Sequence, residues 1–415
     1  MRTSYALRTL CAPWLLLAAL PLEVANFLQR GMPWRGEGMW TVEWFAIVLF
    51  VLGPLAAGCA AIDAARLSRP GNVHLVVTVP RGWRSYVRAA AWCAVPLAVV
   101  HLVTIGCALA YGDVTRPSVG WPALVVQAAL QCLALTWYVA LGSTVGRFVN
   151  PLVAGLAGSV LGFVLTYLLG DGGGDGHFAL LGLGSATISR LGLAYRPSYV
   201  LSQALLLALT AAVMVLVRTR GVRGLRVPDR RGAVALGAAV TAMVLGQLLL
   251  PAQRLEAAPR APELCRVVEI RVCFFGEHRR YADRAVGQIR TLVRAARAKG
   301  YDSLVPTAVV ESSRTFAPTD PRTVTFSLPL STQLAGQERI DDWAYELTAA
   351  THCPTLRAGL PPSERYVQRQ AMLQVTWLHL VGVRSDLFDY FDGLRVLTPT
   401  EAARTVADFR ACRIG

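Results

Sequence analysis

Four cysteines after residue 260 are the residues whose chemistry can be judged first. They are Cys265, Cys273, Cys353 and Cys412, and their even number suits two disulfide bonds in an oxidising compartment. Four cysteines allow three pairings. We favour Cys265–Cys273, which closes a short local loop, together with Cys353–Cys412, which ties the last helix to an earlier one. Free buried thiols are the alternative.

The same region gives little support for a metal site or for catalysis. No CxxC motif occurs, and the neighbours His352 and Cys353 form a single pair without a second. The other histidines there, His278 and His379, lie in no HExxH or triad-like motif. We therefore expect no catalytic residue, no metal ligand set and no cofactor.

Seven apolar stretches precede this region, and each is long enough to form a membrane-spanning helix. A span needs roughly 20 apolar residues, because an α-helix rises about 1.5 Å per residue through a hydrocarbon core of about 30 Å. The stretches cover residues 10–28, 42–63, 89–111, 122–146, 150–170, 198–217 and 233–251. The predicted fold is an α-helical polytopic membrane bundle of six spans plus a seventh, followed by a soluble α+β extracytoplasmic domain.

The arginines between these stretches predict the orientation of the chain. With the N-terminus inside, fourteen arginines fall on the cytoplasmic side and five on the outer side. Because Lys and Arg resist translocation, this distribution favours a cytoplasmic N-terminus, and the seventh span then places the C-terminal domain outside. We expect a six-span membrane domain at residues 1–231, a seventh span with a linker at 232–262, and the extracytoplasmic α+β domain at 263–415.

Secondary structure in the last domain follows from its hydrophobic periodicity. We expect strands at 267–275, 304–310 and 323–328, an Arg-rich amphipathic helix at 277–299, and helices near 333–351, 363–381 and 399–411. The last helix begins at Thr398, Pro399, Thr400 and Glu401, which form a capping box with proline at the first helical position.

The segment between the second and third stretches is amphipathic. Arg81, Arg84 and Arg88 share one helical face, and Trp83 lies on another, so we expect an interfacial helix on the cytoplasmic surface. Ordinary positive-inside anchoring is the alternative explanation.

This segment resembles the coupling-helix region of ABC-2-type transporter permeases. The resemblance lies in Arg69, Gly71, the apolar run 73–79, Pro80 and the basic residues that lead into the third span. Family members often carry an acidic residue just before the arginine, where this chain has Ser68. The whole chain also resembles actinobacterial permease-like proteins with an uncharacterised external domain, which implies a bacterial cell membrane. The resemblance implies that Arg69, Gly71, Pro80, Arg81, Trp83 and Arg84 couple to an ATPase.

That ATPase has to be a separate subunit. A P-loop needs GxxxxGK[ST], and the only lysine, Lys299, is followed by Gly300 and Tyr301. We thus expect a cytoplasmic ATP-binding subunit, membrane lipid and a homodimer as partners. The net charge of +15 does not indicate nucleic acid, because most inner arginines are explained by topology and no basic stripe with interleaved aromatics occurs.

Within the spans, ionisable groups at depth are few. His101 lies near the middle of the third stretch and is a candidate pathway residue, with an interhelical hydrogen bond as the alternative. Glu23 is expected near the outer interface, by the helical rise from Arg8. The glycine pairs 142/146 and 158/162 suit close helix packing, within one subunit or between two.

Two functions fit the sequence. The first is a permease subunit of an ABC-type transporter that moves a hydrophobic or amphipathic substrate, where the substrate class comes from the resemblance. The second is a membrane-tethered sensor or binding protein whose outer domain is the functional unit. A membrane enzyme is the least favoured reading.

Overall fold

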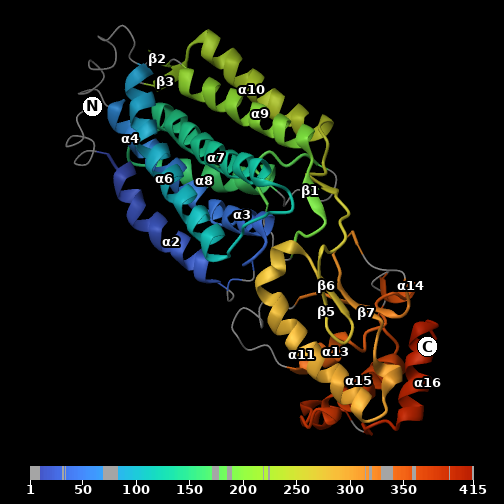
Figure 1. Cartoon of the computed structure of the whole chain (residues 1–415). Coiled ribbons are helices and arrows are strands. Elements are labelled where there is room, and N and C mark those ends of the chain that lie inside the picture. Colours follow the sequence, from blue (N-terminus) through green and yellow to red (C-terminus); the bar gives the residue numbers. More distant parts are fainter. Residues whose placement is uncertain are drawn as a thin grey trace.

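The computed structural model describes most of the chain. The described residues are 10–29, 32, 34–68, 83–170, 177–184, 189–217, 219–222, 225–313, 315–316, 320–328, 340–357, 361–391 and 393–413. The chain is mostly helical up to residue 249 and mixed α/β after it (Figure 1).

Apolar helices form the first part of the chain. In order they are η1 (Ala12–Leu15), α2 (Leu16–Leu28), α3 (Gly38–Ala46), α4 (Leu49–Leu67), α6 (Trp83–Tyr111), α7 (Trp121–Phe148), α8 (Ala154–Leu169), α9 (Pro197–Leu216) and α10 (Arg230–Leu249). Five of them, α4, α6, α7, α9 and α10, are long and apolar enough to cross a membrane. The combined segment η1–α2 and helix α8 are apolar but shorter.

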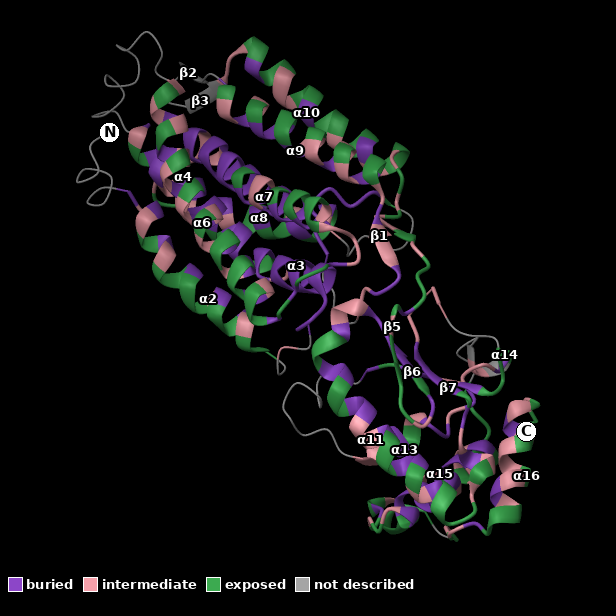
Figure 2. Cartoon of the chain, viewed as in Figure 1, coloured by how far each residue is buried: buried purple, intermediate pink, exposed green. Residues whose placement is uncertain are grey.

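The second predicted span, 42–63, is not one continuous helix. Helix α3 ends at Ala46 and α4 begins at Leu49. All nine residues of α3 are buried, as Figure 2 shows in purple, whereas α4 has an exposed side. Helix α3 is therefore a short buried element at the start of the second predicted stretch.

Small residues let α4 lie at the centre of the bundle, against α7 and α8. A Cβ atom added at Gly142 would overlap the carbonyl of Ala57, and one added at Gly146 would overlap that of Ala61. On α8, Gly158 approaches the same two alanines. The predicted glycine pairs thus serve packing within one chain, where backbones approach each other closely.

Helix α10 lies at the edge of the bundle beside α9. Its buried residues are Gly232, Ala239 and Gly246, spaced by seven, and most of its remaining surface is exposed and apolar. The two helices are connected by the hairpin of β2 (Thr219–Val222) and β3 (Leu225–Pro228), which pair in antiparallel register.

The C-terminal domain is built on a four-stranded sheet in the order β5-β6-β7-β8. Strand β5 (Leu264–Val267) pairs antiparallel with β6 (Arg271–Phe274), while β7 (Ala308–Glu311) and β8 (Thr323–Phe326) continue the sheet in parallel. The single strand expected at 267–275 is therefore a hairpin. Its register places Cys265 opposite Cys273, and these two cysteines form a disulfide bond.

Helices pack against this sheet and against one another. They are α11 (Arg279–Ala298), α13 (Ile340–Glu346), α14 (Pro354–Arg357), α15 (Glu364–Leu380) and α16 (Pro399–Arg410), with short 3-10 turns η4 (Gly276–His278), η5 (Asp302–Leu304) and η6 (Asp386–Asp389). The predicted capping box of α16 is present at Thr398 and Glu401. A second disulfide joins Cys353 to Cys412. Both disulfides have the pairing that the spacing favours.

The C-terminal domain is not joined to the helices by a simple linker. Within the expected linker, β4 (Leu255–Ala257) pairs antiparallel with β1 (Leu193–Tyr195), which precedes α9. One continuous hydrophobic cluster also contains Trp34, which precedes α3, and Trp44 of α3 together with Phe274 and Tyr281 of the C-terminal domain. The two parts of the chain therefore share a packed core.

Candidate functional site

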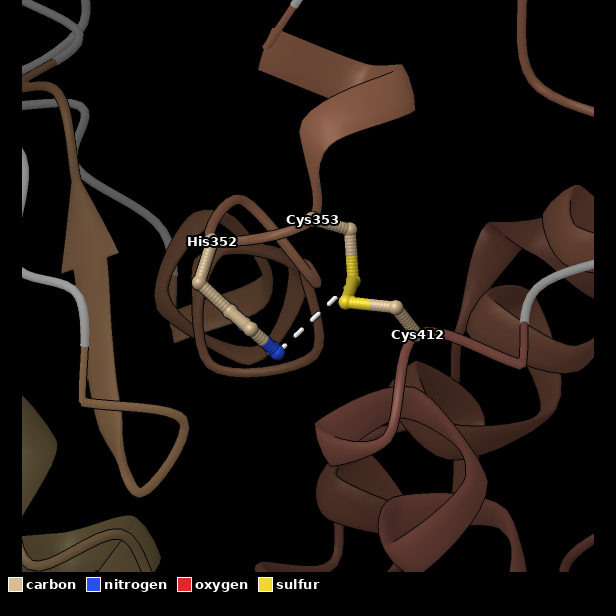
Figure 3. Close-up of side chains that lie close together, drawn as sticks. All are labelled: His352, Cys353 and Cys412. Carbon is tan, nitrogen blue, oxygen red and sulfur yellow. Dashed lines mark hydrogen bonds between the residues drawn. A yellow bond between two sulfur atoms is a disulfide. The ribbon is translucent and has the colours of Figure 1, made fainter.

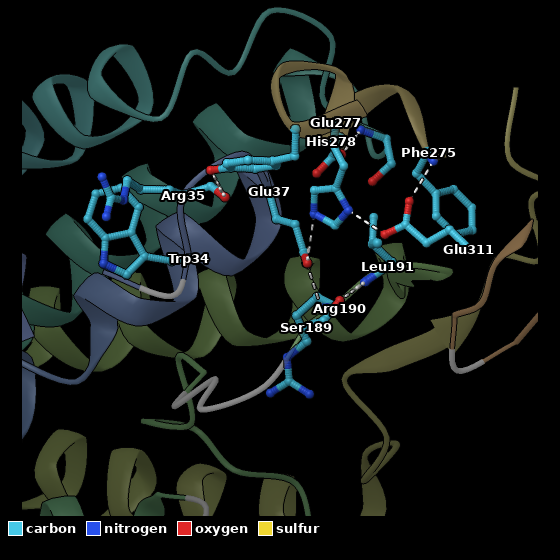
Figure 4. A network of polar contacts seen from close by, with 12 residues as sticks. Trp34, Arg35, Glu37, Ser189, Arg190, Leu191, Phe275, Glu277, His278 and Glu311 are labelled. Atoms are coloured by element: carbon cyan, nitrogen blue, oxygen red, sulfur yellow. Dashed lines mark hydrogen bonds and ion pairs between the residues drawn. The ribbon is translucent and has the colours of Figure 1, made fainter. Parts of the chain in front are cut away.

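The junction between the helices and the C-terminal domain contains a buried charged network centred on His278 (Figure 4). His278 ends the turn η4 just before α11, and Glu311 is the last residue of β7. The Nδ1 atom of His278 lies 2.5 Å from Oε1 of Glu311, whose Oε2 accepts a hydrogen bond of 2.8 Å from the backbone N–H of Phe275. Both side chains are about 1% exposed.

The other side of this histidine faces the helical part of the chain. Glu37 is the residue before α3, and its Oε1 lies 3.4 Å from Nε2 of His278. That contact is an ion pair without hydrogen-bond alignment, since neither atom has a hydrogen-bond partner. The second oxygen of Glu37 accepts a 2.9 Å bond from the backbone N–H of Arg190. One histidine thus bridges two buried carboxylates that lie 274 positions apart in the sequence, which follows from residue numbers 37 and 311.

Electrostatics indicate that His278 carries a positive charge. Burial lowers the pKa of an imidazole, but the carboxylates of Glu311 and Glu37 raise it, and the pKa of His278 lies well above its usual value. A buried carboxylate without a partner would be costly, so the imidazolium compensates both groups. Removing the histidine would leave two buried negative charges.

A second charged cluster lies one and a half helical turns further along α3. Glu43 is fully buried. Its Oε2 accepts a hydrogen bond of 2.8 Å from Nε of Arg190, and its Oε1 accepts one of 2.7 Å from Nη1 of Arg254. Arg190 thereby contacts Glu37 through its backbone and Glu43 through its guanidinium. Arg254 belongs to the segment after α10. Glu37 and Glu43 thus hold together segments that are distant in sequence. The segments are those that contain Arg190, Arg254 and His278.

Glu277, the neighbour of His278, faces a polar cleft at the same junction. Its carboxylate accepts hydrogen bonds from the backbone N–H groups of Gly38 and Ser118. Burial and the nearby charge of Glu37 raise the pKa of Glu277 to about 7. The cleft has a volume of about 270 Å³, and its charged lining residues are Asp113, Arg116, Arg266, Glu277, Arg279, Arg280 and Asp283.

Inside the helical part, His101 has two close polar partners. Its Nδ1 lies 2.7 Å from Oε1 of Glu23, and its Nε2 lies 2.7 Å from Oε1 of Gln131. The amide nitrogen of Gln131 donates to the carbonyl of Val42 in α3, so its oxygen accepts from the imidazole. The expected interhelical hydrogen bond of His101 is present. Glu23 is buried and contacts His101 directly.

Of the residues predicted to couple to an ATPase, Trp83 and Arg84 lie at the end of the bundle opposite the junction. Arg69, Gly71, Pro80 and Arg81 are outside the described residues. Trp83 is the first residue of α6, and Arg84 is exposed, with its guanidinium 6.0 Å from the Trp83 ring.

The C-terminal domain contains one three-residue group with metal-ligand atoms among the described residues. His352, Cys353 and Cys412 have their ligand atoms within 4.8 Å of one another (Figure 3). Both sulfur atoms belong to the disulfide, and Nε2 of His352 lies 3.2 Å from the carbonyl oxygen of Arg410. The group in this form is a structural crosslink, because thiolates are what bind zinc.

Sequence reasoning missed most of the junction network. Glu37, Glu43, Arg190, Arg254 and Glu311 were not singled out, and His278 was considered only for motifs. One signal was available, because two acidic residues six positions apart interrupt the otherwise aromatic and apolar stretch 34–50. A charged residue in an apolar stretch without a partner nearby in the sequence indicates a partner that is distant in the sequence.

Comparisons with family models, with curated proteins and with solved structures give no match to this chain.

Proposed function

We propose that this chain is a membrane permease subunit in which the helices and a docked outer domain move as one unit. In this proposal the N-terminus is cytoplasmic, the C-terminal domain is extracytoplasmic, and a separate ATP-binding subunit supplies energy through residues 69–88. The substrate would be hydrophobic or amphipathic, as the resemblance to ABC-2-type permeases implies. The five long apolar helices and the two disulfides support the membrane and the oxidising outer compartment.

The observation that carries the proposal is the buried network at α3. A domain that is merely tethered needs no buried ions at its attachment, and burying them is costly unless the geometry is good. Here Glu37 and Glu43 contact His278, Arg190 and Arg254 while their helix packs inside the bundle. A displacement of the helices would therefore have to move the C-terminal domain.

Helix α3 also reaches the polar cluster within the bundle. The carbonyl of Val42 accepts from Gln131, which holds the ring of His101. The helix is thus linked to His101 through Gln131 and to His278 through Glu37, the residue that precedes it. This connection supports mechanical coupling between the two parts, in either direction.

The coupling role is tested by reversing charge at the far end of the bundle. Arg81→Glu together with Arg84→Glu should weaken binding of a nucleotide-binding partner or reduce its stimulated ATPase activity, because a docking surface would change sign. Membrane insertion should persist, since twelve inner arginines remain. The matched control is Arg116→Glu, an exposed arginine at the junction end.

Co-purification in mild detergent decides whether the permease role stands. We expect a stoichiometric nucleotide-binding subunit that the double variant loses and the control retains. Absence of any such partner, or full activity of the double variant with it, contradicts the permease role.

A transmembrane sensor is the second candidate, and the polar cleft at the junction favours it. The cleft has Asp113 and Arg116 from the helical part on one side and Arg279 and Asp283 from the C-terminal domain on the other. A charged ligand held there would contact both parts at once. A chain that purifies alone, and whose junction becomes more protected from hydrogen exchange on binding a small charged solute, supports the sensor.

A further inference from the structure

A groove lies between α9 and α10 at the end of the bundle farthest from the C-terminal domain, near the hairpin β2–β3 (Figure 1). Its volume is about 880 Å³. The walls are apolar and come mainly from one face of α9, with Leu209, Ala212, Val213 and Leu216. The mouth is formed by the start of α10, where Arg230 and Arg231 lie. The groove is therefore apolar along its length and cationic at one end.

The mouth, which Asp229 also lines, carries a net positive charge. Arg230 and Arg231 are exposed, and no acidic side chain pairs with either of them among the residues that the structure describes. Asp229, the single acidic residue between 218 and 231, is the N-cap of α10 and accepts from the N–H of Gly232 at 2.7 Å. The same segment contains six arginines. An anionic group is the ligand that this charge favours.

The way α10 packs explains why the groove is open. The helix contacts its neighbour along the narrow seam of Gly232, Ala239 and Gly246, and it leaves Val234, Val240 and Leu248 exposed. Leu209 and Leu216 of α9 are likewise more than half exposed. Apolar walls that protein does not cover are suited to acyl chains if the helices lie in a bilayer.

We propose that the groove binds an anionic phospholipid, with its phosphate at Arg230 and Arg231 and its acyl chains along α9. Basic pockets between spanning helices at the cytoplasmic side hold such headgroups by charge, while the tails contribute apolar contact. The inference depends on membrane insertion and on nothing in the permease or sensor role. In this proposal the lipid in the groove remains bound to the protein.

The test uses the purified full-length protein and native mass spectrometry. Dioleoylphosphatidylglycerol is titrated against dioleoylphosphatidylcholine, with glycerol 3-phosphate as a competitor that has the headgroup charge but no tails. We expect at least about tenfold preference for the anionic lipid and no displacement by the competitor. Changing Arg230→Gln together with Arg231→Gln should weaken phosphatidylglycerol binding about 30-fold and leave phosphatidylcholine binding unchanged.

Two further variants keep the proposal falsifiable. Arg84→Gln with Arg88→Gln removes two exposed arginines from the same end of the bundle, on α6 and away from the groove, and should leave lipid preference intact. Ala212→Trp, at an exposed position of α9, fills the groove and should expel the lipid while the arginines remain.

The proposal is overturned if the two lipids bind equally, or if glycerol 3-phosphate competes as well as the lipid. It also fails if the α6 control loses as much affinity as the α10 pair, because binding would then reflect overall charge. A change of oligomeric state in Ala212→Trp without loss of lipid would assign the groove to a second copy of the chain.

Discussion

Replacing His278 with alanine should open the junction between the C-terminal domain and the helices. The change leaves the carboxylates of Glu37 and Glu311 buried, each about 1% exposed, with backbone N–H groups as their remaining hydrogen-bond donors among the described residues. Breaking a buried ion pair by removing one member costs about 3–5 kcal/mol. The junction should therefore open at least about 100-fold more often.

Two backbone amides report directly on this network. The N–H of Arg190 donates to Glu37, and the N–H of Phe275 donates to Glu311. Hydrogen exchange of the peptides that contain them measures the free energy of local opening. In His278→Ala, exchange at both sites should accelerate at least about 100-fold, whereas His278→Gln, which keeps an N–H donor without charge, should give an intermediate value.

The matched control is the other histidine with a hydrogen bond in the C-terminal domain. His352 is partly buried, and its ring contacts the carbonyl of Arg410 at 3.2 Å, so His352→Ala should cost about 1 kcal/mol at its own site and little at the junction. The reasoning is refuted if His278→Ala exchanges within about threefold of the unchanged protein at Arg190 and Phe275. It is equally refuted if His352→Ala accelerates those two amides as much.

Three other predictions follow from the same structure. Because the pKa of His278 is raised, its stabilisation of the junction is present while the imidazole is protonated. That stabilisation is lost as pH rises through the pKa that His278 has in the folded protein. The pKa of Glu277, raised from 4.5 to about 7, adds a loss of stability with the same sign between those two values. Junction exchange, corrected for intrinsic rates, should therefore accelerate as pH rises above about 4.5 and continue to accelerate as His278 loses its proton; a constant or slower rate would contradict this. Gly142→Leu should destabilise the helical part by several kcal/mol, because a Cβ atom at this position overlaps the backbone of Ala57. Gly237→Leu should be tolerated, because nothing lies within 4 Å of a Cβ atom there. Equal thermal stability of the two variants would argue against the close packing of α4 and α7. Replacing both cysteines of the Cys353–Cys412 bridge with serine should lower the unfolding free energy of the C-terminal domain by about 4 kcal/mol, because the bridge spans 59 positions. Alkylation of either cysteine in the native protein without reductant would show that the bridge is absent.

The sequence alone determined the features that depend on short-range periodicity and on composition. The apolar stretches predicted helices that the structure contains, since 3.6-residue geometry and length are local properties. The box at Thr398 and Glu401 likewise fixed the start of α16, because an N-cap and its partner are three residues apart. An even number of cysteines in the last domain suited the two disulfides.

Only the tertiary structure decided where the isolated polar residues meet. Glu37, Arg190, His278 and Glu311 are scattered over 274 positions, and no local pattern encodes which of them contact one another. Helix α3 packs in one hydrophobic cluster with residues of the C-terminal domain and of the bundle, an arrangement that hydropathy along the chain does not contain. A buried charge is tolerated where distant segments supply its partner, and those segments come together only when the whole chain has folded.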